Sequence, residues 1–199
     1  RLFLEGIPDK AKRGAELVKQ RSNLTVKSFK KTSELLPYAE QLFEILNEAF
    51  DELPFVVKLD KQMIDYYVKR YLMLLNPEFV KLVFDEEQNL VAFIIGLPSL
   101  SLGLQKAKGS IFPLGWYHLQ KALKHPKVID LMLTGILPKY QAKGVTAVLF
   151  YELHHVMEKY GVTEMETTGV FETNQKVIQN WKNYEHLQHK RKRCWVKGM

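Results

Sequence analysis

One segment, residues 128–160, limits the fold of this chain more than any other. Residues 128–136 are mostly apolar, which predicts a buried strand, and residues 144–160 carry apolar side chains at helical spacing, which predicts an amphipathic helix. Residues 137–143 alone join the two. Because strands and helices alternate most regularly after residue 127, the pattern predicts a sheet covered by helices, with one parallel crossover near its centre.

The other elements follow from the same kinds of pattern and give an α/β (α+β) fold with a mixed, mostly antiparallel central sheet flanked by helices. Strands are expected at 24–30, 79–84, 90–97, 162–171 and 186–196. Helices are expected at 33–50, 61–75, 113–124 and 174–183, and a loop at 98–112. Residues 1–24 are expected to form an N-terminal extension or the tail of an upstream segment, and residues 25–197 a single domain.

Composition excludes several classes of protein. The chain has 199 residues, of which 46% are hydrophobic, so it is long enough for one packed domain and too apolar for a disordered segment. No apolar run reaches the roughly 18 residues that span a bilayer, and no membrane partner is expected. The single cysteine, Cys194, excludes an intrachain disulfide and fits a cytoplasmic location. The net charge of +7 is compatible with nucleic acid, a membrane surface or an anionic cofactor, and also with none of these.

The turn before the long helix is a candidate phosphate site. A helix N-terminus carries unpaired backbone N–H groups and a partial positive charge, and both favour a bound pyrophosphate. Gly144 permits a close approach of the backbone, Lys139 and Lys143 add positive charge, and Thr146 offers a hydroxyl group. The same residues are also compatible with an ordinary turn that contains one glycine and two solvated lysines.

The turn resembles the acetyl-CoA-binding motif of the GNAT superfamily of N-acetyltransferases. The matching residues are Pro138, Tyr140, Gln141, Lys143, Gly144 and Val145, whereas Thr146 replaces the usual small residue. The expected order of elements from Leu24 to Lys197 also matches that fold. The resemblance implies an acyl-CoA N-acyltransferase-like domain that uses acetyl-CoA, or another acyl-CoA, as its cosubstrate.

The resemblance also implies a set of site residues. The backbone of Ile136 and Leu137 would pair with the pantetheine arm, and Asn174 matches an Asn that begins a short helix after the next strand. Trp181 stands where the family often has a tyrosine acid, and it is expected to pack beside the pantetheine. Tyr184, three residues further on, is the candidate general acid. The pyrophosphate would be held by Gln141, Ala142, Lys143, Gly144, Val145 and Thr146.

No general base stands out. Alternation along the strands places Asp130 and Thr134 on one face of their strand, and Glu166 and Thr168 on one face of the next. Any of these could approach an amine, and each could equally be a polar residue with local partners. Adjacent His154 and His155 point about 100° apart on a helix and do not predict a metal site, so no metal is expected.

The sequence therefore favours an N-acyltransferase that moves an acetyl or short acyl group directly from coenzyme A to an amine on a small molecule or peptide. The alternative is a non-catalytic acyl-CoA-binding or regulatory module on the same fold, which the tryptophan at position 181 favours. The basic run from Lys190 to Arg193 is typical of a solvated strand face, so nucleic acid is not the expected partner. The sequence does not decide whether the chain forms a homodimer.

Overall fold

The computed structural model describes residues 1–6, 9–51, 53, 56–71, 75–141, 143–172, 174–181, 184–193 and 195. They form one six-stranded sheet in the order β1-β6-β5-β4-β3-β2. Only β5 and β6 pair in parallel, and every other neighbouring pair is antiparallel. This confirms the expected fold class and the single parallel crossover. The strands are β1 (Leu2–Phe3), β2 (Thr25–Ser28), β3 (Val80–Phe84), β4 (Leu90–Pro98), β5 (Val128–Ile136) and β6 (Glu164–Thr167).

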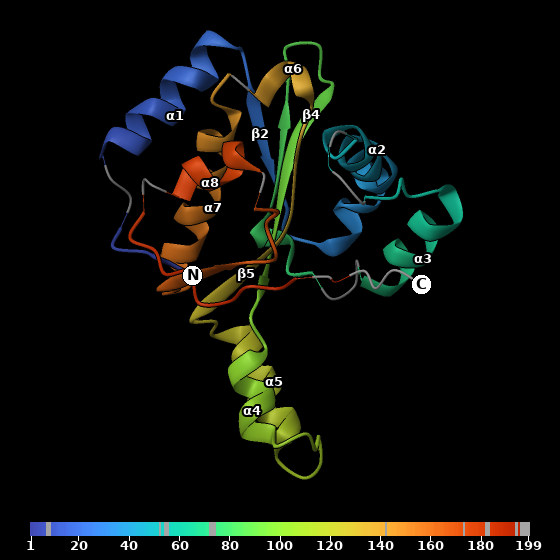
Figure 1. Ribbon diagram of the computed structural model, residues 1–199, viewed down its shortest axis with the longest axis vertical. Helices are drawn as coiled ribbons and strands as arrows, with labels where there is room; N and C mark the ends of the chain where they lie inside the picture. The colour runs from blue at the N-terminus through green and yellow to red at the C-terminus, as the bar shows by residue number, and fades with distance from the viewer. Residues whose placement is uncertain are drawn as a thin grey trace.

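Helices cover both faces of the sheet (Figure 1). On one face lies α7 (Val145–Lys159), with α1 (Asp9–Arg21) packed against it and α8 (Gln175–Trp181) nearby. On the other face α2 (Ala39–Ala49) packs against β4 and β5, and α3 (Lys61–Tyr71) lies outside it. Two helices, α4 (Ser101–Ala107) and α5 (Gly115–Lys124), project from one end of the sheet, and α6 (Pro138–Gln141) lies at the other.

The core has two layers, one on each side of the sheet. Alternation along β4 sends Ile94 into the layer under α7 and Phe93 and Ile95 into the layer under α2. Both faces of β3 and β4 are covered, so nearly all their residues are buried, which explains why β4 has no charged residue and why β3 is apolar except for the buried Lys81. Leu149 and Leu153 of α7 are fully buried, and they fix this helix on the central strands.

Residues 1–24, expected to form an extension, take part in this packing. Leu2 pairs with Met165 of β6 and is buried in the core. In α1, Ala15 is fully buried and Val18 packs against the layer under α7.

None of the helices in the described part of the chain combines the length and the apolar character that crossing a membrane requires.

Four local expectations are wrong. Residues 98–112 contain α4 rather than forming only a loop, and the helix expected at 33–50 begins at Ala39 after two short 3-10 turns, the second of which contains Pro37. The strand expected at 162–171 is limited to Glu164–Thr167. Residues 186–193 form no strand, and only His186 makes an isolated bridge, to Leu2. The edge of β6 is already taken by β1, and residues 185–187 hydrogen-bond instead to residues 1–3, where β1 is only two residues long.

Gly135 provides a test of the layer under α2. A Cβ at this position would lie 2.5 Å from Cε1 of Phe93 and 3.1 Å from Cγ2 of Ile45. We expect Gly135→Ala to lower the free energy of unfolding by about 1–3 kcal/mol through overpacking. In the matched control Gly14→Ala the new Cβ meets nothing within 4 Å, and a better helix former should raise the free energy by roughly 0.5–1 kcal/mol. Urea unfolding measures both, and equal effects would contradict this account.

Candidate functional site

Strands β5 and β6 separate halfway along β5 and form a fork in the sheet. They pair from Val128 to Leu131 on β5, opposite Glu164 to Thr167, and β5 then continues to Ile136 with only β4 beside it among the described strands. Thr168 lies at this fork: its backbone N–H donates to the carbonyl of Leu131 (3.4 Å), and its Oγ1 donates to the carbonyl of Met132 (3.5 Å). The second half of β5 therefore presents an open edge.

Backbone groups alternate along this open edge. The N–H of Leu137 donates to the carbonyl of Val91 on the β4 side (3.0 Å), and the carbonyl of Leu137 accepts from the N–H of Tyr140 (2.8 Å). By alternation, the N–H and carbonyl of Ile136 face the open edge. There the carbonyl of Ile136 accepts from Nε2 of Gln141 at 3.3 Å. Of the two residues expected to pair with a pantetheine arm, Ile136 thus faces the opening, whereas both backbone groups of Leu137 are engaged within the chain.

A β-bulge lies at the fork. Leu133 pairs with Ile95 and Leu131 pairs with Gly96, so Met132 is an extra residue on β5. The extra residue reverses the faces that follow: Thr134 lies opposite Ile94, on the α7 side, whereas Asp130 lies opposite Leu97, on the α2 side. The expectation that Asp130 and Thr134 share a face is therefore wrong.

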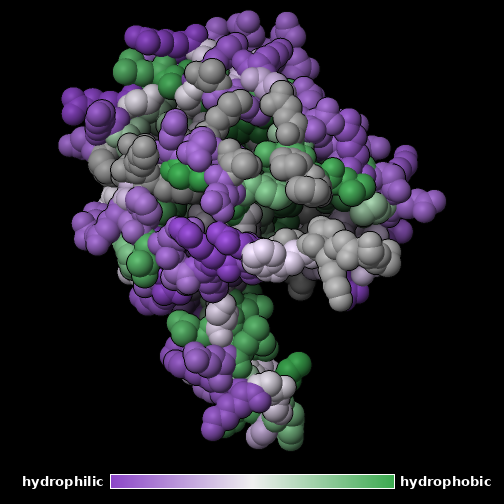
Figure 2. Space-filling model, viewed as in Figure 1, coloured by the Kyte–Doolittle hydropathy of each residue, from purple (hydrophilic) through white to green (hydrophobic). Residues whose placement is uncertain are grey.

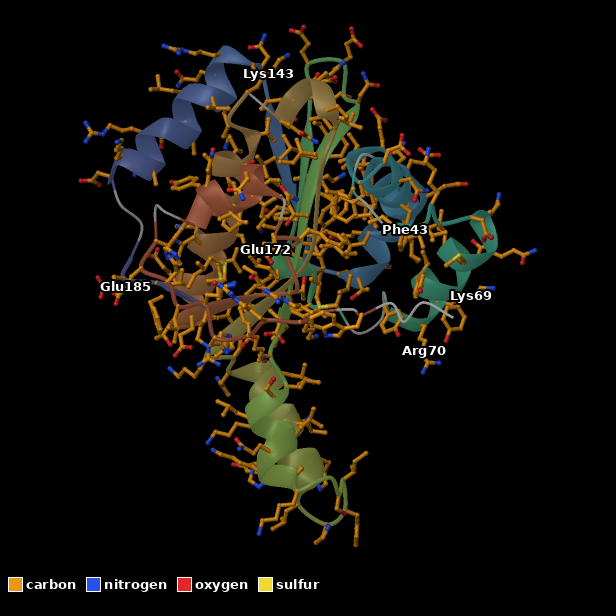
Figure 3. All side chains as sticks on the ribbon, in the orientation of Figure 1. Phe43, Lys69, Arg70, Lys143, Glu172 and Glu185 are labelled. Atoms are coloured by element: carbon orange, nitrogen blue, oxygen red, sulfur yellow. The ribbon has the colours of Figure 1, made fainter. Side chains whose placement is uncertain are left out.

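The turn after β5 is built by core interactions. Tyr140 is buried, and its hydroxyl donates to Oδ2 of Asp85 at 3.0 Å. Burial alone would raise the pKa of Asp85, but hydrogen bonds from Asn89 and Tyr140 bring it below its usual value. The ammonium groups of Lys139 and Lys143 lie 5.0 and 4.8 Å from the centroid of the Tyr140 ring, so the turn carries two cations. Lys143 lies at the same end of the molecule as α6 (Figure 3).

Gly144 ends the turn and precedes the first residue of α7. Its φ of +79° lies in the left-handed region that favours glycine. A Cβ here would lie 2.8 Å from Cγ2 of Val18, because α1 runs alongside α7 and is also tied to it by the ion pair between Lys19 and Glu152 (2.8 Å). The fold therefore needs a glycine at this position whether or not a coenzyme binds. Val18 belongs to residues 1–24, so this segment contributes directly to the packing around the turn.

The remaining expected site residues are placed as follows. Asn174 caps α8, since its Oδ1 accepts from the N–H of Val177 (3.3 Å). Tyr184 is half-buried against Phe150 of α7, with ring centroids 6.2 Å apart, and burial raises the pKa of its hydroxyl. Val145 is buried in the core, Thr146 is half-buried and Lys143 is exposed. Ala142 and the side chain of Trp181 lie outside the described part of the structure.

Two carboxylates lie side by side at the base of the fork, on the α2 side. Asp130 and Glu166 are register partners on β5 and β6. Burial raises the pKa of Asp130, although a hydrogen bond from Ser99 opposes this, and the charge of Glu166 raises it further. Glu166 itself accepts from Nζ of Lys190 at 2.5 Å, which lowers its pKa. Of these two carboxylates, Asp130 is thus the one whose pKa is raised toward neutral pH. Across the described residues, no three His, Cys, Asp or Glu side chains are grouped so as to hold a metal ion.

Comparison with known proteins supports one fold. No protein-family model matches this sequence, and no curated protein sequence matches it. Among solved structures, an aminoglycoside acetyltransferase from an uncultured soil metagenomic sample, in complex with sisomicin, is 10% identical with a TM-score of 0.54, and the match covers 91% of this chain and 99% of that one. A ribosomal-protein-alanine N-acetyltransferase from Brucella melitensis biovar Abortus 2308 is 11% identical with a TM-score of 0.52, covering 87% and 99%.

A third structure contains a coenzyme. A GNAT family acetyltransferase from Brucella melitensis, in complex with acetyl-CoA, is 13% identical with a TM-score of 0.50, and the match covers 78% of this chain and 82% of that one. At such identities the likeness concerns the fold. The chain therefore has the fold of the GNAT acetyltransferases, an open mixed sheet flanked by helices.

The packing of α1 on Gly144 can be tested by a double-mutant cycle. We expect Gly144→Ala to destabilise the protein by about 1–3 kcal/mol, because the new methyl group combines a left-handed φ with a clash against Val18. In a Val18→Ala background the clash is removed and the cost of Gly144→Ala should fall to about 1 kcal/mol, which is the conformational part. Chemical unfolding of the four proteins measures the coupling. Strictly additive effects would contradict this role for Val18.

Proposed function

We propose that this chain is an N-acyltransferase that moves an acetyl or other short acyl group from coenzyme A to an amine. One observation carries the proposal: the open edge of β5 leads through a lysine-bearing turn directly to the N-terminus of α7. An extended ligand can add to an open strand edge, and an anion can bind at a helix N-terminus. The strand edge and the helix N-terminus follow each other directly, as the two parts of coenzyme A, the acyl-pantetheine arm and the pyrophosphate, require.

Several residues of the chain would hold such a cosubstrate. Thr134 and Ile136 offer backbone groups to the pantetheine arm, once Gln141 releases the carbonyl of Ile136. The N–H groups at the start of α7, from Gly144 to Thr146, would bind the pyrophosphate, since the first turn of a helix has no intrahelical partners for them. The exposed ammonium group of Lys143 adds charge attraction. The coenzyme would supply the activated thioester.

The two faces of the fork offer different chemistry. Asp130 on the α2 side is suited to take a proton from the attacking amine, because its raised pKa makes it a stronger base. Tyr184 packs in the α7 layer and carries a phenolic proton that it can donate, although burial raises its pKa and so makes it a weaker acid than a free tyrosine. The bulge leaves the backbone N–H of Met132 outside the regular ladder, where it can donate to an oxyanion.

The acceptor is proposed as an amine on a small molecule or a peptide. Of the proteins with a similar fold, one is named for aminoglycosides and another for an alanine of a ribosomal protein. A second candidate function is that of a non-catalytic acyl-CoA-binding or regulatory module. It is favoured by Trp181, which stands seven residues after Asn174, because an indole N–H donates a hydrogen bond but is not a usable acid.

Binding of the cosubstrate at α7 can be tested with Thr146→Glu. A carboxylate in the first helical turn favours the helix dipole, so we expect the protein to stay folded. The same charge repels a pyrophosphate at that N-terminus, so it should weaken acetyl-CoA binding roughly tenfold or more. Isothermal titration calorimetry measures the affinity.

The matched control for this test is Gln62→Glu. It adds the same charge to the first turn of α3, where the side chain is exposed. We expect it to leave acetyl-CoA affinity unchanged. Equal affinity in the wild type and in Thr146→Glu would place any bound coenzyme elsewhere. Tight binding without thiol release across a panel of amines would instead favour the non-catalytic module.

The role of Asp130 predicts a pH dependence. The base must be deprotonated, so kcat/KM should fall as the pH drops through the raised pKa of Asp130. In Asp130→Asn we expect this acidic limb to disappear and kcat to fall by roughly 10²–10⁴-fold. In Glu166→Gln the limb should move to lower pH, because the charge that raises the pKa of Asp130 is gone. An unmoved limb in both variants would exclude Asp130 as the base.

A further inference from the structure

The helical hairpin α4–α5 is packed by its smallest residues. A Cβ on Gly103 would lie 3.1 Å from the carbonyl oxygen of His118 and 3.3 Å from Cβ of Ala122. A Cβ on Gly115 would overlap the carbonyl oxygen of Ser110. The two helices therefore touch through backbone and small side chains, and close approach of this kind is common between helices in membranes.

Most large apolar side chains of the hairpin consequently point outward. At its tip, Phe112 is 83% exposed, Ile111 is 67% exposed and Leu114 is 65% exposed. Leu102 and Leu104 lie about 200° apart around α4, and both are more than half exposed. Figure 2 shows the hairpin as a projection on which hydrophobic residues lie beside hydrophilic ones, below a body with many hydrophilic residues. The other exposed apolar side chains of the hairpin are Trp116, Tyr117 and Leu123.

The charged side chains of the hairpin are all basic. Residues 99–129 contain no Asp or Glu, although the whole chain has 22, and they contain five lysines. A second basic segment, residues 189–193, lies near the base of the hairpin. Its Lys190 binds Glu166, and Glu166 pairs in register with Asp130, which follows α5 closely in the chain. The lysines of the hairpin are Lys106, Lys108, Lys121, Lys124 and Lys127.

We propose that the α4–α5 hairpin docks this protein on an anionic lipid bilayer, with residues 110–116 entering the interfacial region. Aromatic and aliphatic side chains at the tip and lysines around it match the two signals that peripheral anchors combine. Helices of 7 and 10 residues are about 10 and 15 Å long, so they can enter the interface but cannot span the bilayer.

A bilayer fits this surface better than a protein partner does. A protein partner covers one side of a helix, whereas the apolar side chains of α4 are exposed on opposite sides. A lipid interface surrounds an inserted tip from all sides. The expectation of no membrane partner rested on the lack of a long apolar run, and docking through a short hairpin needs no such run. The inference does not depend on acyl transfer.

The tip can be tested by vesicle flotation. The wild-type chain should float with vesicles of phosphatidylcholine mixed with phosphatidylglycerol, and much less with phosphatidylcholine alone. Ile111→Ser/Phe112→Ser should reduce the partition coefficient roughly tenfold or more by removing inserted apolar surface. The matched control is Val56→Ser/Val57→Ser, which removes two exposed apolar side chains (40% and 77% exposed) elsewhere on the chain. It should bind vesicles like the wild type.

The charge contribution has its own matched pair. Lys106→Gln/Lys108→Gln should weaken binding to the anionic vesicles roughly 30-fold, at about fivefold for each lysine. Lys10→Gln/Lys12→Gln on α1 removes the same charge from exposed positions, and it should have a much smaller effect. Insertion itself should shift tryptophan fluorescence to the blue in the wild type. Trp116→Phe should lose this shift while it keeps vesicle binding.

Three results would overturn the proposal. The first is equal vesicle binding by the wild type and by Ile111→Ser/Phe112→Ser. The second is no preference for anionic vesicles. The third is a wild-type dimer in analytical ultracentrifugation that the tip substitutions dissolve, together with no vesicle binding, since the hairpin would then pair two copies of the chain. Circular dichroism of each variant checks that the fold is kept.

Discussion

The incomplete pairing of β5 is the constraint on which the rest of this structure depends. A central strand normally pairs on both sides along its whole length, because buried backbone groups need partners. Here β6 ends at Thr167, and β5 continues past the bulge at Met132 with one edge open. Thr168 ties the two strands together at the point where they part. The open edge exists because β6 ends, and β4, which pairs with the other side of β5 as far as Ile136, keeps this part of β5 extended.

The turn beyond the open edge is held by contacts within the chain. Tyr140 is hydrogen-bonded to Asp85 in the core, Val18 packs over Gly144, and α7 is buried on one face along its length. The N-terminus of α7 is thus held in place before any anion arrives. Such preorganisation lowers the ordering cost of binding. Gln141 is the adjustable part, because its side chain satisfies the carbonyl of Ile136 that an added strand would use.

Much of the fold could be predicted from the sequence, because strong periodic patterns determine it. The strand at 128–136 and the following helix agree with the structure almost residue for residue. The face of Asp130 could not be predicted, since one bulged residue reverses the alternation; the apolar triplet from Leu131 to Leu133 is its only sign in the sequence. The edge strand at residues 2–3 is two residues long, too short for any periodicity. Helix α4 was missed because glycine and lysine are typical of loops, whereas Gly103 here serves close packing.

The two ends of β5 give the molecule a direction. The hairpin joins the end of β4 to the start of β5, whereas the lysine-bearing turn follows the last residue of β5. Nine residues of strand separate these ends, a distance of roughly 25–30 Å. With the hairpin tip in a lipid interface, Asp130 would lie on the membrane side of the sheet, and the N-terminus of α7 would lie at the opposite, solvent side. A charged cosubstrate would then enter from the solvent side, and an amine carried at the membrane surface would approach the opposite end of the same strand.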